Sequence, residues 1–81
     1  MKPKVTFYTR RDCGLCEEAK RVVESVRRQS DFELEEIDID GDPELSALYG
    51  WEVPVIAING RKAFKYRVEP RELRRKLEAR W

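Results

Sequence analysis

The chain has 81 residues, which is enough for one domain, residues 1–81, and too few for two separate cores. Charged and hydrophobic residues each make up 41 % of it, a balance typical of globular proteins that excludes a disordered chain. The net charge of +1 predicts no attraction to nucleic acid or to an anionic membrane. No apolar run approaches the ~20 residues of a membrane span, and the first residues lack a secretory signal, so we expect a cytoplasmic protein without a membrane partner.

The first half of the chain predicts two strands and two helices. Residues 4–9 alternate β-branched and aromatic side chains and predict a strand, and residues 14–29 carry apolar side chains at helical spacing. Residues 32–39 predict a second strand. Its apolar parity changes between Leu34 and Ile37, which implies a bulge or burial on both faces. Asp42 and Pro43 then begin a short helix that Gly50 can end.

The second half predicts a hairpin and a last helix. Residues 53–60 form an apolar run that ends at Asn59-Gly60, a strong hairpin signal, and residues 62–68 form the returning strand. Pro70 begins a helix that extends to Trp81. The order strand, helix, strand, helix, strand, strand, helix predicts an α/β fold with a four-stranded mixed sheet flanked by three helices.

The only two cysteines, Cys13 and Cys16, stand in "CGLC", where the first strand gives way to the first helix. In the cytosol such a pair is more often catalytic or metal-binding than structural. The free amides at the helix start favour the thiolate of Cys13; Arg10 and Arg11 act the same way, whereas Asp12 opposes them. Cys16 returns to nearly the same helix face one turn later. We therefore predict Cys13 as the nucleophile and Cys16 as the thiol that resolves a mixed disulfide.

Other interpretations of the cysteine pair remain open. A structural zinc site needs four Cys or His ligands, whereas this chain has two cysteines and no histidine, so one chain cannot complete such a site and we predict no bound metal. A dimer that pools four cysteines could hold zinc or an iron-sulfur cluster. Both cysteines could also be buried thiols with no chemistry.

Val53-Pro54 begins the third expected strand, where a proline cannot donate a ladder hydrogen bond. Pro54 either marks the first residue of the strand or follows a cis bond. A cis bond would turn the Val53 backbone outward and leave its N–H and C=O free for an extended substrate. Near this loop, Tyr8, Tyr49 and Trp51 either pack at the rim of the core or contact a ligand.

A resemblance to a known family follows from these motifs. The strand, the "CGLC" that opens a helix, and the "EVP" that leads into "VIAING" and a hairpin resemble a glutaredoxin-like domain of the thioredoxin fold, over essentially the whole chain. "CGLCEEAK", "LEEIDIDGDPEL" and "VPVI" are similar to stretches of small bacterial glutaredoxin-like proteins. The resemblance implies that Pro54 is cis and lies beside Cys13. It also implies that the Val53 main chain contacts glutathione or a protein substrate.

The activity implied by the resemblance is thiol-disulfide exchange. We expect a monomer that reduces disulfides in proteins, or glutathione mixed disulfides, through Cys13 and Cys16. No tightly bound cofactor is expected, and glutathione or a thioredoxin reductase-like enzyme would supply the electrons. Two alternatives of other classes are a dimeric iron-sulfur cluster carrier, which uses Cys13 of each subunit together with glutathione, and a redox-inert binding module.

The sequence departs from the glutaredoxin pattern at two places. Glutaredoxins usually have proline and an aromatic residue after the first cysteine, whereas "CGLC" has glycine and leucine. They also have a Gly-Gly pair and an acid before the last helix, where a glutathione carboxylate binds. Here "RVEP" is expected to present the bulk of Val68 and the charge of Glu69 at that place. Arg67 is a candidate substitute contact there, and Arg10 or Arg11 is one for the other carboxylate of glutathione.

Overall fold

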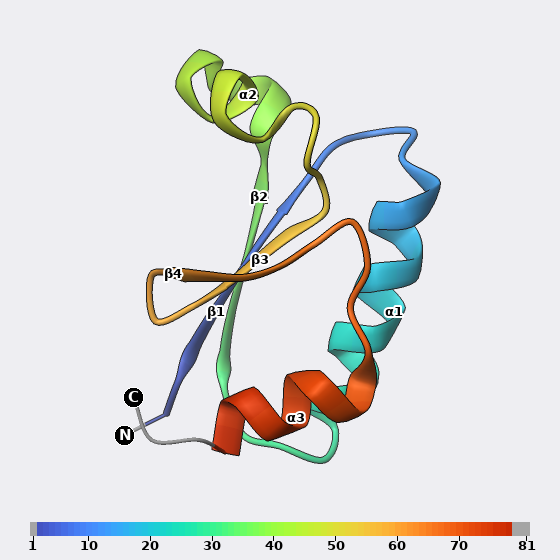
Figure 1. The fold of residues 1–81 in the computed structure, drawn as a ribbon, viewed down its shortest axis with the longest axis vertical. Helices are drawn as coiled ribbons and strands as arrows, with labels where there is room; N and C mark the ends of the chain where they lie inside the picture. Colours follow the sequence, from blue (N-terminus) through green and yellow to red (C-terminus); the bar gives the residue numbers. More distant parts are fainter. Residues whose placement is uncertain (1, 79–81) are drawn as a thin grey trace.

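In a computed structural model that describes residues 2–78, the elements follow the expected order (Figure 1). The strands are β1 (Lys4–Thr9), β2 (Glu33–Asp38), β3 (Val55–Ile58) and β4 (Arg61–Lys65). The helices are α1 (Gly14–Arg27), α2 (Pro43–Tyr49) and α3 (Pro70–Glu78), and the 3₁₀ turn η1 (Ile39–Gly41) links β2 to α2. The part of the last helix predicted for residues 79–81 lies outside the described residues.

The four strands form one mixed sheet in the order β2-β1-β3-β4. The strands β1 and β2 are parallel, and β3 is antiparallel to both β1 and β4. This arrangement confirms the predicted four-stranded sheet with its antiparallel hairpin. Because α1 connects the parallel pair, the carboxyl end of β1 leads directly into the loop that carries the cysteines.

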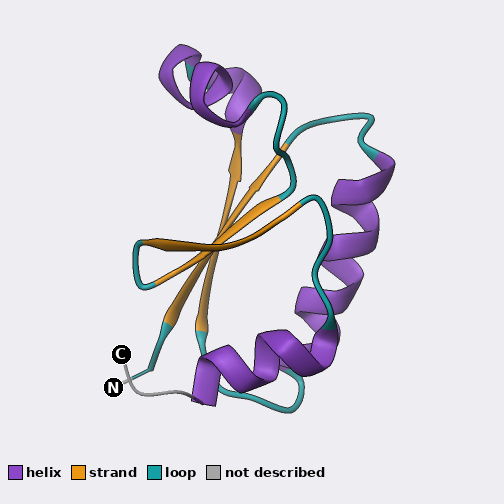
Figure 2. Ribbon diagram, viewed as in Figure 1, coloured by secondary structure: helices purple, strands orange, loops and turns teal. Residues whose placement is uncertain are grey.

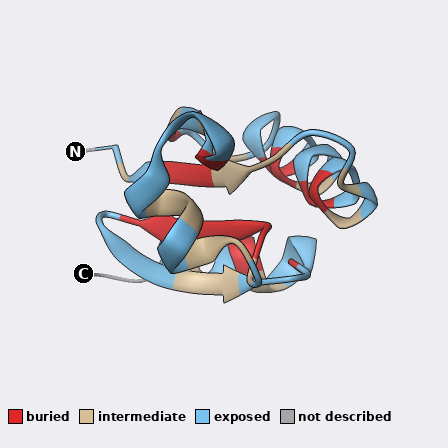
Figure 3. Cartoon of the chain, turned by 90° about the horizontal axis from the view of Figure 1, so that it is seen from above, coloured by how far each residue is buried: buried red, intermediate tan, exposed pale blue. Residues whose placement is uncertain are grey.

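The helices form two groups around this sheet. Helices α1 and α3 pack on each other and cover one face, whereas α2 lies on the other side, beyond the end of β2 (Figures 1 and 2). Buried residues concentrate on the strands and on the inner sides of the helices (Figure 3). The main core, between the sheet and the helices α1 and α3, consists of Val5, Phe7, Ala19, Val23, Val26, Phe32, Ile56, Ile58, Val68 and Leu73.

The parity change in the second strand is now explained. The register of β1 and β2 runs without a shift from Lys4↔Glu33 to Thr9↔Asp38, so β2 contains no bulge. Leu34 packs against the main core, and Ile37, at the opposite parity, is also half-buried. Burial on both faces, one of the two predicted alternatives, is therefore the correct one.

The hairpin forms as predicted, but its returning strand is shorter. Asn59 and Gly60 both have positive φ, 51° and 85°, as a tight hairpin turn requires. Strand β4 ends at Lys65, so the expected strand over residues 62–68 is wrong for its last three positions. The reason is the left-handed conformation of Tyr66, with φ 68°, whose N–H donates to the carbonyl of Pro54 at 2.9 Å and turns the chain toward α3.

Candidate functional site

Cys13 occupies the N-cap position of α1, with an extended backbone at φ −118° and ψ 105°. Its Sγ accepts a hydrogen bond from the backbone N–H of Cys16 at 3.2 Å, and its carbonyl accepts one from Glu17 at 3.1 Å. The sulfur thus takes the place that a serine or aspartate oxygen usually has at a helix start. A negative charge on this sulfur would face the positive end of the helix dipole.

Cys16 lies behind Cys13 and is only 2 % exposed. It forms a second small core cluster with Ile39 and Val53, against which Tyr8, Cys13, Leu45 and Tyr49 pack. Burial raises the pKa of the Cys16 thiol, and its hydrogen bond with Cys13 acts in the same direction. Hydrogen bonds from the Thr9 hydroxyl and the Arg10 backbone lower that pKa in part. Both cysteines are free thiols, one half-exposed and one buried.

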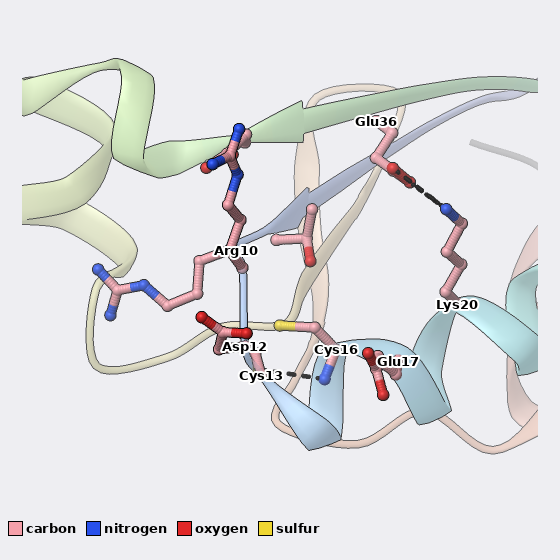
Figure 4. A pocket seen from close by; sticks show the side chains of 10 residues that line it. Arg10, Asp12, Cys13, Cys16, Glu17, Lys20 and Glu36 are labelled. Carbon is pink, nitrogen blue, oxygen red and sulfur yellow. Dashed lines mark hydrogen bonds and ion pairs between the residues drawn. The ribbon is translucent and has the colours of Figure 1, made fainter.

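The two cysteines line a common cavity of about 330 Å³ (Figure 4). The Cys16 sulfur points toward the loop that carries Arg10 and Asp12 (Figure 4). The cavity contains charges of both signs, and Lys20 and Glu36 form an ion pair at 3.2 Å across it. Its other lining residues are Thr9, the cations Arg10 and Arg11, and the acids Asp12, Glu17 and Asp38. A polar substrate could therefore contact either sign of charge beside the sulfurs.

Arg10, a predicted substrate contact, lines this cavity but is tied to two groups of the protein. Its guanidinium donates to a carboxylate oxygen of Asp40 at 2.7 Å and to the carbonyl of Gly50 at 3.0 Å. The hydrogen bond with Asp40 raises the pKa of Arg10 and lowers the pKa of Asp40. The side chain thus links the cysteine loop to η1 and to the end of α2.

The Val53–Pro54 peptide bond is cis, and both residues are buried. The Val53 side chain shares the small cluster of Cys16. The expectation that its N–H is free for a substrate is wrong, because this N–H donates to the carbonyl of Tyr49 at 3.0 Å and extends the last turn of α2. Among residues 2–78, no backbone N–H donates to the Val53 carbonyl. The position of Pro54 beside Cys13 stays a prediction.

The segment that replaces the Gly-Gly pair does not line the cysteine cavity. Arg67, Val68 and Glu69 line a smaller cavity of about 130 Å³, together with Leu15 and other residues of α1. Val68 is 8 % exposed and belongs to the main core, so most of its side chain faces inward, and its contact with a ligand stays a prediction. The turn at Tyr66 directs Val68 inward. Arg67 as a substrate contact stays a prediction.

The three candidate aromatic residues separate in the structure. The rings of Tyr8 and Tyr49 lie 4.7 Å apart and pack against the Cys16 cluster. Trp51, in contrast, is 92 % exposed. It lines a shallow cavity that shares Arg10 with the cysteine cavity and is completed by Ser46 and Gly50. Of the two predicted alternatives, packing at the rim of the core is therefore correct for Tyr8 and Tyr49.

Sequence reasoning missed five residues of the cysteine cavity: Thr9, Glu17, Lys20, Glu36 and Asp38. The sequence pointed to two of them, since Glu17 follows Cys13, and Lys20 follows Cys16, by four residues on the same helix face. The other three required the register of the parallel pair, in which Thr9 lies opposite Asp38. That register could not be obtained without knowing which strands pair.

Within residues 2–78, no three or more Cys, His, Asp or Glu side chains are grouped closely enough to bind a metal ion. None of the helices in this part of the chain has the length and apolar character needed to cross a membrane.

Known proteins resemble this chain along nearly its full length. The family model described as Glutaredoxin-like domain (DUF836) matches residues 4–78. A glutaredoxin-like protein of Dictyostelium discoideum is 34 % identical over 80 residues, which cover 91 % of this chain and 74 % of that protein. An uncharacterized protein of Mycobacterium tuberculosis is 28 % identical over 78 residues, or 90 % of this chain and 80 % of its own.

Several solved protein structures are also similar to this chain over nearly its full length. Protein Ne2328 of Nitrosomonas europaea superposes with a TM-score of 0.82 at 31 % identity, covering 96 % of this chain and 94 % of its own. The X. campestris protein XcR50 gives 0.78 at 31 % identity, covering 91 % and 95 %. A thioredoxin of Halobacterium salinarum, at 23 % identity and a TM-score of 0.73 over 95 % of this chain and 73 % of its own, shares the fold. The chain therefore belongs to the glutaredoxin-like family (DUF836).

Proposed function

We propose that this protein is a thiol-disulfide oxidoreductase that reduces disulfides through Cys13 and Cys16. The observation that carries the proposal is the position of Cys13 Sγ at the start of α1. There it accepts the Cys16 N–H at 3.2 Å while it remains half-exposed in the cavity. A helix N-terminus stabilises the thiolate, and only the thiolate attacks a disulfide. The buried Cys16 is held within one helical turn of it.

The reaction follows from these two positions. The Cys13 thiolate attacks one sulfur of the substrate disulfide, forms a mixed disulfide and releases the other sulfur as a thiolate. The Cys16 thiolate then attacks Cys13 Sγ, so that a Cys13–Cys16 disulfide forms and the second substrate sulfur leaves as a thiolate. The substrate gains two electrons and the protein loses two. An external reductant restores the dithiol.

The proposal includes the setting in which the reaction occurs. The protein acts as a cytoplasmic monomer on disulfide-containing proteins or glutathione mixed disulfides, without a tightly bound cofactor. Glutathione or a thioredoxin reductase-like enzyme supplies the electrons, and Arg10, Val53, Pro54 and Arg67 contact the substrate. Comparing turnover of a protein disulfide with glutathione and glutathione reductase against turnover with thioredoxin reductase identifies the donor.

Variants of the two cysteines test the mechanism. Cys13→Ser should reduce disulfide reduction to background, whereas Cys16→Ser should stop after the first step and accumulate a mixed disulfide, visible as a mass adduct on Cys13. Since Cys16 is buried, Cys16→Ala serves as a second variant in case a buried hydroxyl destabilises the fold. Full activity of Cys13→Ser would refute the proposed function.

A further inference from the structure

The buried position of Cys16 raises a chemical question about the second step of the proposed reaction. The thiol is 2 % exposed and packs against Ile39 and Val53, an apolar environment that disfavours a charged sulfur. Its own backbone N–H donates to Cys13 and is therefore not available to its own sulfur. Resolution nevertheless requires a Cys16 thiolate. Some other group must stabilise that charge.

Thr9 is in the right place to do so. It is the last residue of β1 and has the same parity as Val5 and Phe7, which face α1 in the main core. At this end of the sheet the element above that face is the first turn of α1, which holds Cys16. Thr9 and Cys16 line the same cavity, and hydrogen bonding by the Thr9 side chain is one of the effects that lower the pKa of the Cys16 thiol.

The charged groups around Cys16 do not offer an equivalent contact. Across the strand pair, Thr9 faces Asp38, a carboxylate that would repel a thiolate. The lysine that lines the cavity, Lys20, is paired with Glu36. The Arg10 side chain is held by Asp40 and Gly50, although hydrogen bonding by its backbone also lowers the pKa of the Cys16 thiol. The other charges that line the cavity are Arg11, Asp12 and Glu17, and the titratable groups packed against the Cys16 cluster are Cys13, Tyr8 and Tyr49.

We propose that Thr9 is a positioning residue for the resolving step: its hydroxyl, at the carboxyl end of β1, donates to the Cys16 sulfur and stabilises the thiolate that attacks Cys13. The inference rests on the proposed function and assigns the residue that controls its second half. Thr9 keeps its proton throughout. The proton of Cys16 passes to solvent, the Cys16–Cys13 bond forms, and the Cys13–substrate bond breaks with its electron pair on the departing sulfur.

The test follows the two steps separately, with dithiobis-nitrobenzoate as the disulfide probe. Attack by Cys13 releases one coloured thiolate, and resolution by Cys16 releases the second. Thr9→Val keeps the shape but removes the hydroxyl. It should leave the first phase unchanged and slow the second about tenfold at neutral pH, as expected for one lost hydrogen bond to a charged group. The pH at which the rate of the second phase reaches half of its maximum should also rise. Thr9→Ser, which restores a hydroxyl, should restore the rate and this pH.

Thr6→Val is the matched control, because Thr6 is a buried threonine on the same strand with the opposite parity. It should change neither phase. The inference is overturned if Thr9→Val resolves at the wild-type rate across the pH range, or if Thr9→Ser is as slow as Thr9→Val. A wild-type protein that releases no second thiolate would instead refute the dithiol mechanism of the proposed function, so the two failures are distinguishable.

Discussion

At the scale of single residues, the site depends on side chains that serve the protein and the chemistry together. Cys13 caps α1 with its sulfur, and Arg10 holds Asp40 and Gly50 while it lines the cysteine cavity. The two cysteines could be assigned from sequence because their spacing carries a chemical requirement. The partners of Arg10 could not, because they lie 30 and 40 residues away in sequence and depend on how η1 and α2 pack beside the loop.

The contact between Arg10 and Asp40 predicts a pH-dependent stability. The hydrogen bond from Arg10 lowers the pKa of Asp40 below its ordinary value of 3.8, so folding favours the ionised carboxyl. The ionised Asp40 carboxylate contributes its full stabilisation when the pH is above the ordinary pKa of 3.8. This stabilisation disappears as the pH falls through the lowered pKa of the folded protein. Denaturant unfolding should therefore find wild type more stable than Asp40→Asn at pH 7, and the two should converge below about pH 4. A difference that stays constant down to pH 3 would contradict this.

At the scale of elements, sequence patterns worked where one physical requirement dominates. The apolar periodicity of α1, the Asp42 cap of α2 and the Asn59-Gly60 turn all appear as predicted. The boundaries that failed, as at residues 66–68, are set by tertiary contacts. The N–H of Tyr66 is taken by carbonyls of the loop before β3, a contact with no local sequence signal.

The end of α2 offers a test at this scale. Gly50 has an ordinary helical φ of −55°, so it is not required for a left-handed turn. Instead, a Cβ at this position would lie 2.5 Å from the carbonyl oxygen of Ser46, so Gly50→Ala should lower the free energy of unfolding by roughly 1–3 kcal/mol. Gly14→Ala is the control. A Cβ there meets nothing within 4 Å, and alanine favours a helix start by up to about 1 kcal/mol. Equal effects of the two changes on chemical denaturation would argue against the steric explanation.

At the scale of the whole molecule, the strand and helix order was enough to predict the mixed sheet, because connections of this length leave few topologies. The distribution of the helices over its two sides was less accessible. Only the structure shows that α1 and α3 share one face and that α2 carries no buried residue. As a result the apolar interior has two parts, a main core under α1 and α3 and a smaller cluster around Cys16.

This division predicts that stability and thiol chemistry can be changed separately. Leu73 of α3 is fully buried in the main core and does not belong to the Cys16 cluster. Leu73→Ala should lower the free energy of unfolding by about 2–5 kcal/mol, because it leaves a cavity between α3 and the sheet. Well below the unfolding transition, the rate at which Cys13 reacts with a disulfide probe should stay at the wild-type value. Leu48→Ala, at a leucine that is 64 % exposed on α2, is the control and should change stability by less than about 0.5 kcal/mol. If Leu73→Ala instead changes the reaction rate of Cys13 in the fully folded protein, the main core and the Cys16 cluster are coupled. Stability and thiol chemistry could then not be changed separately.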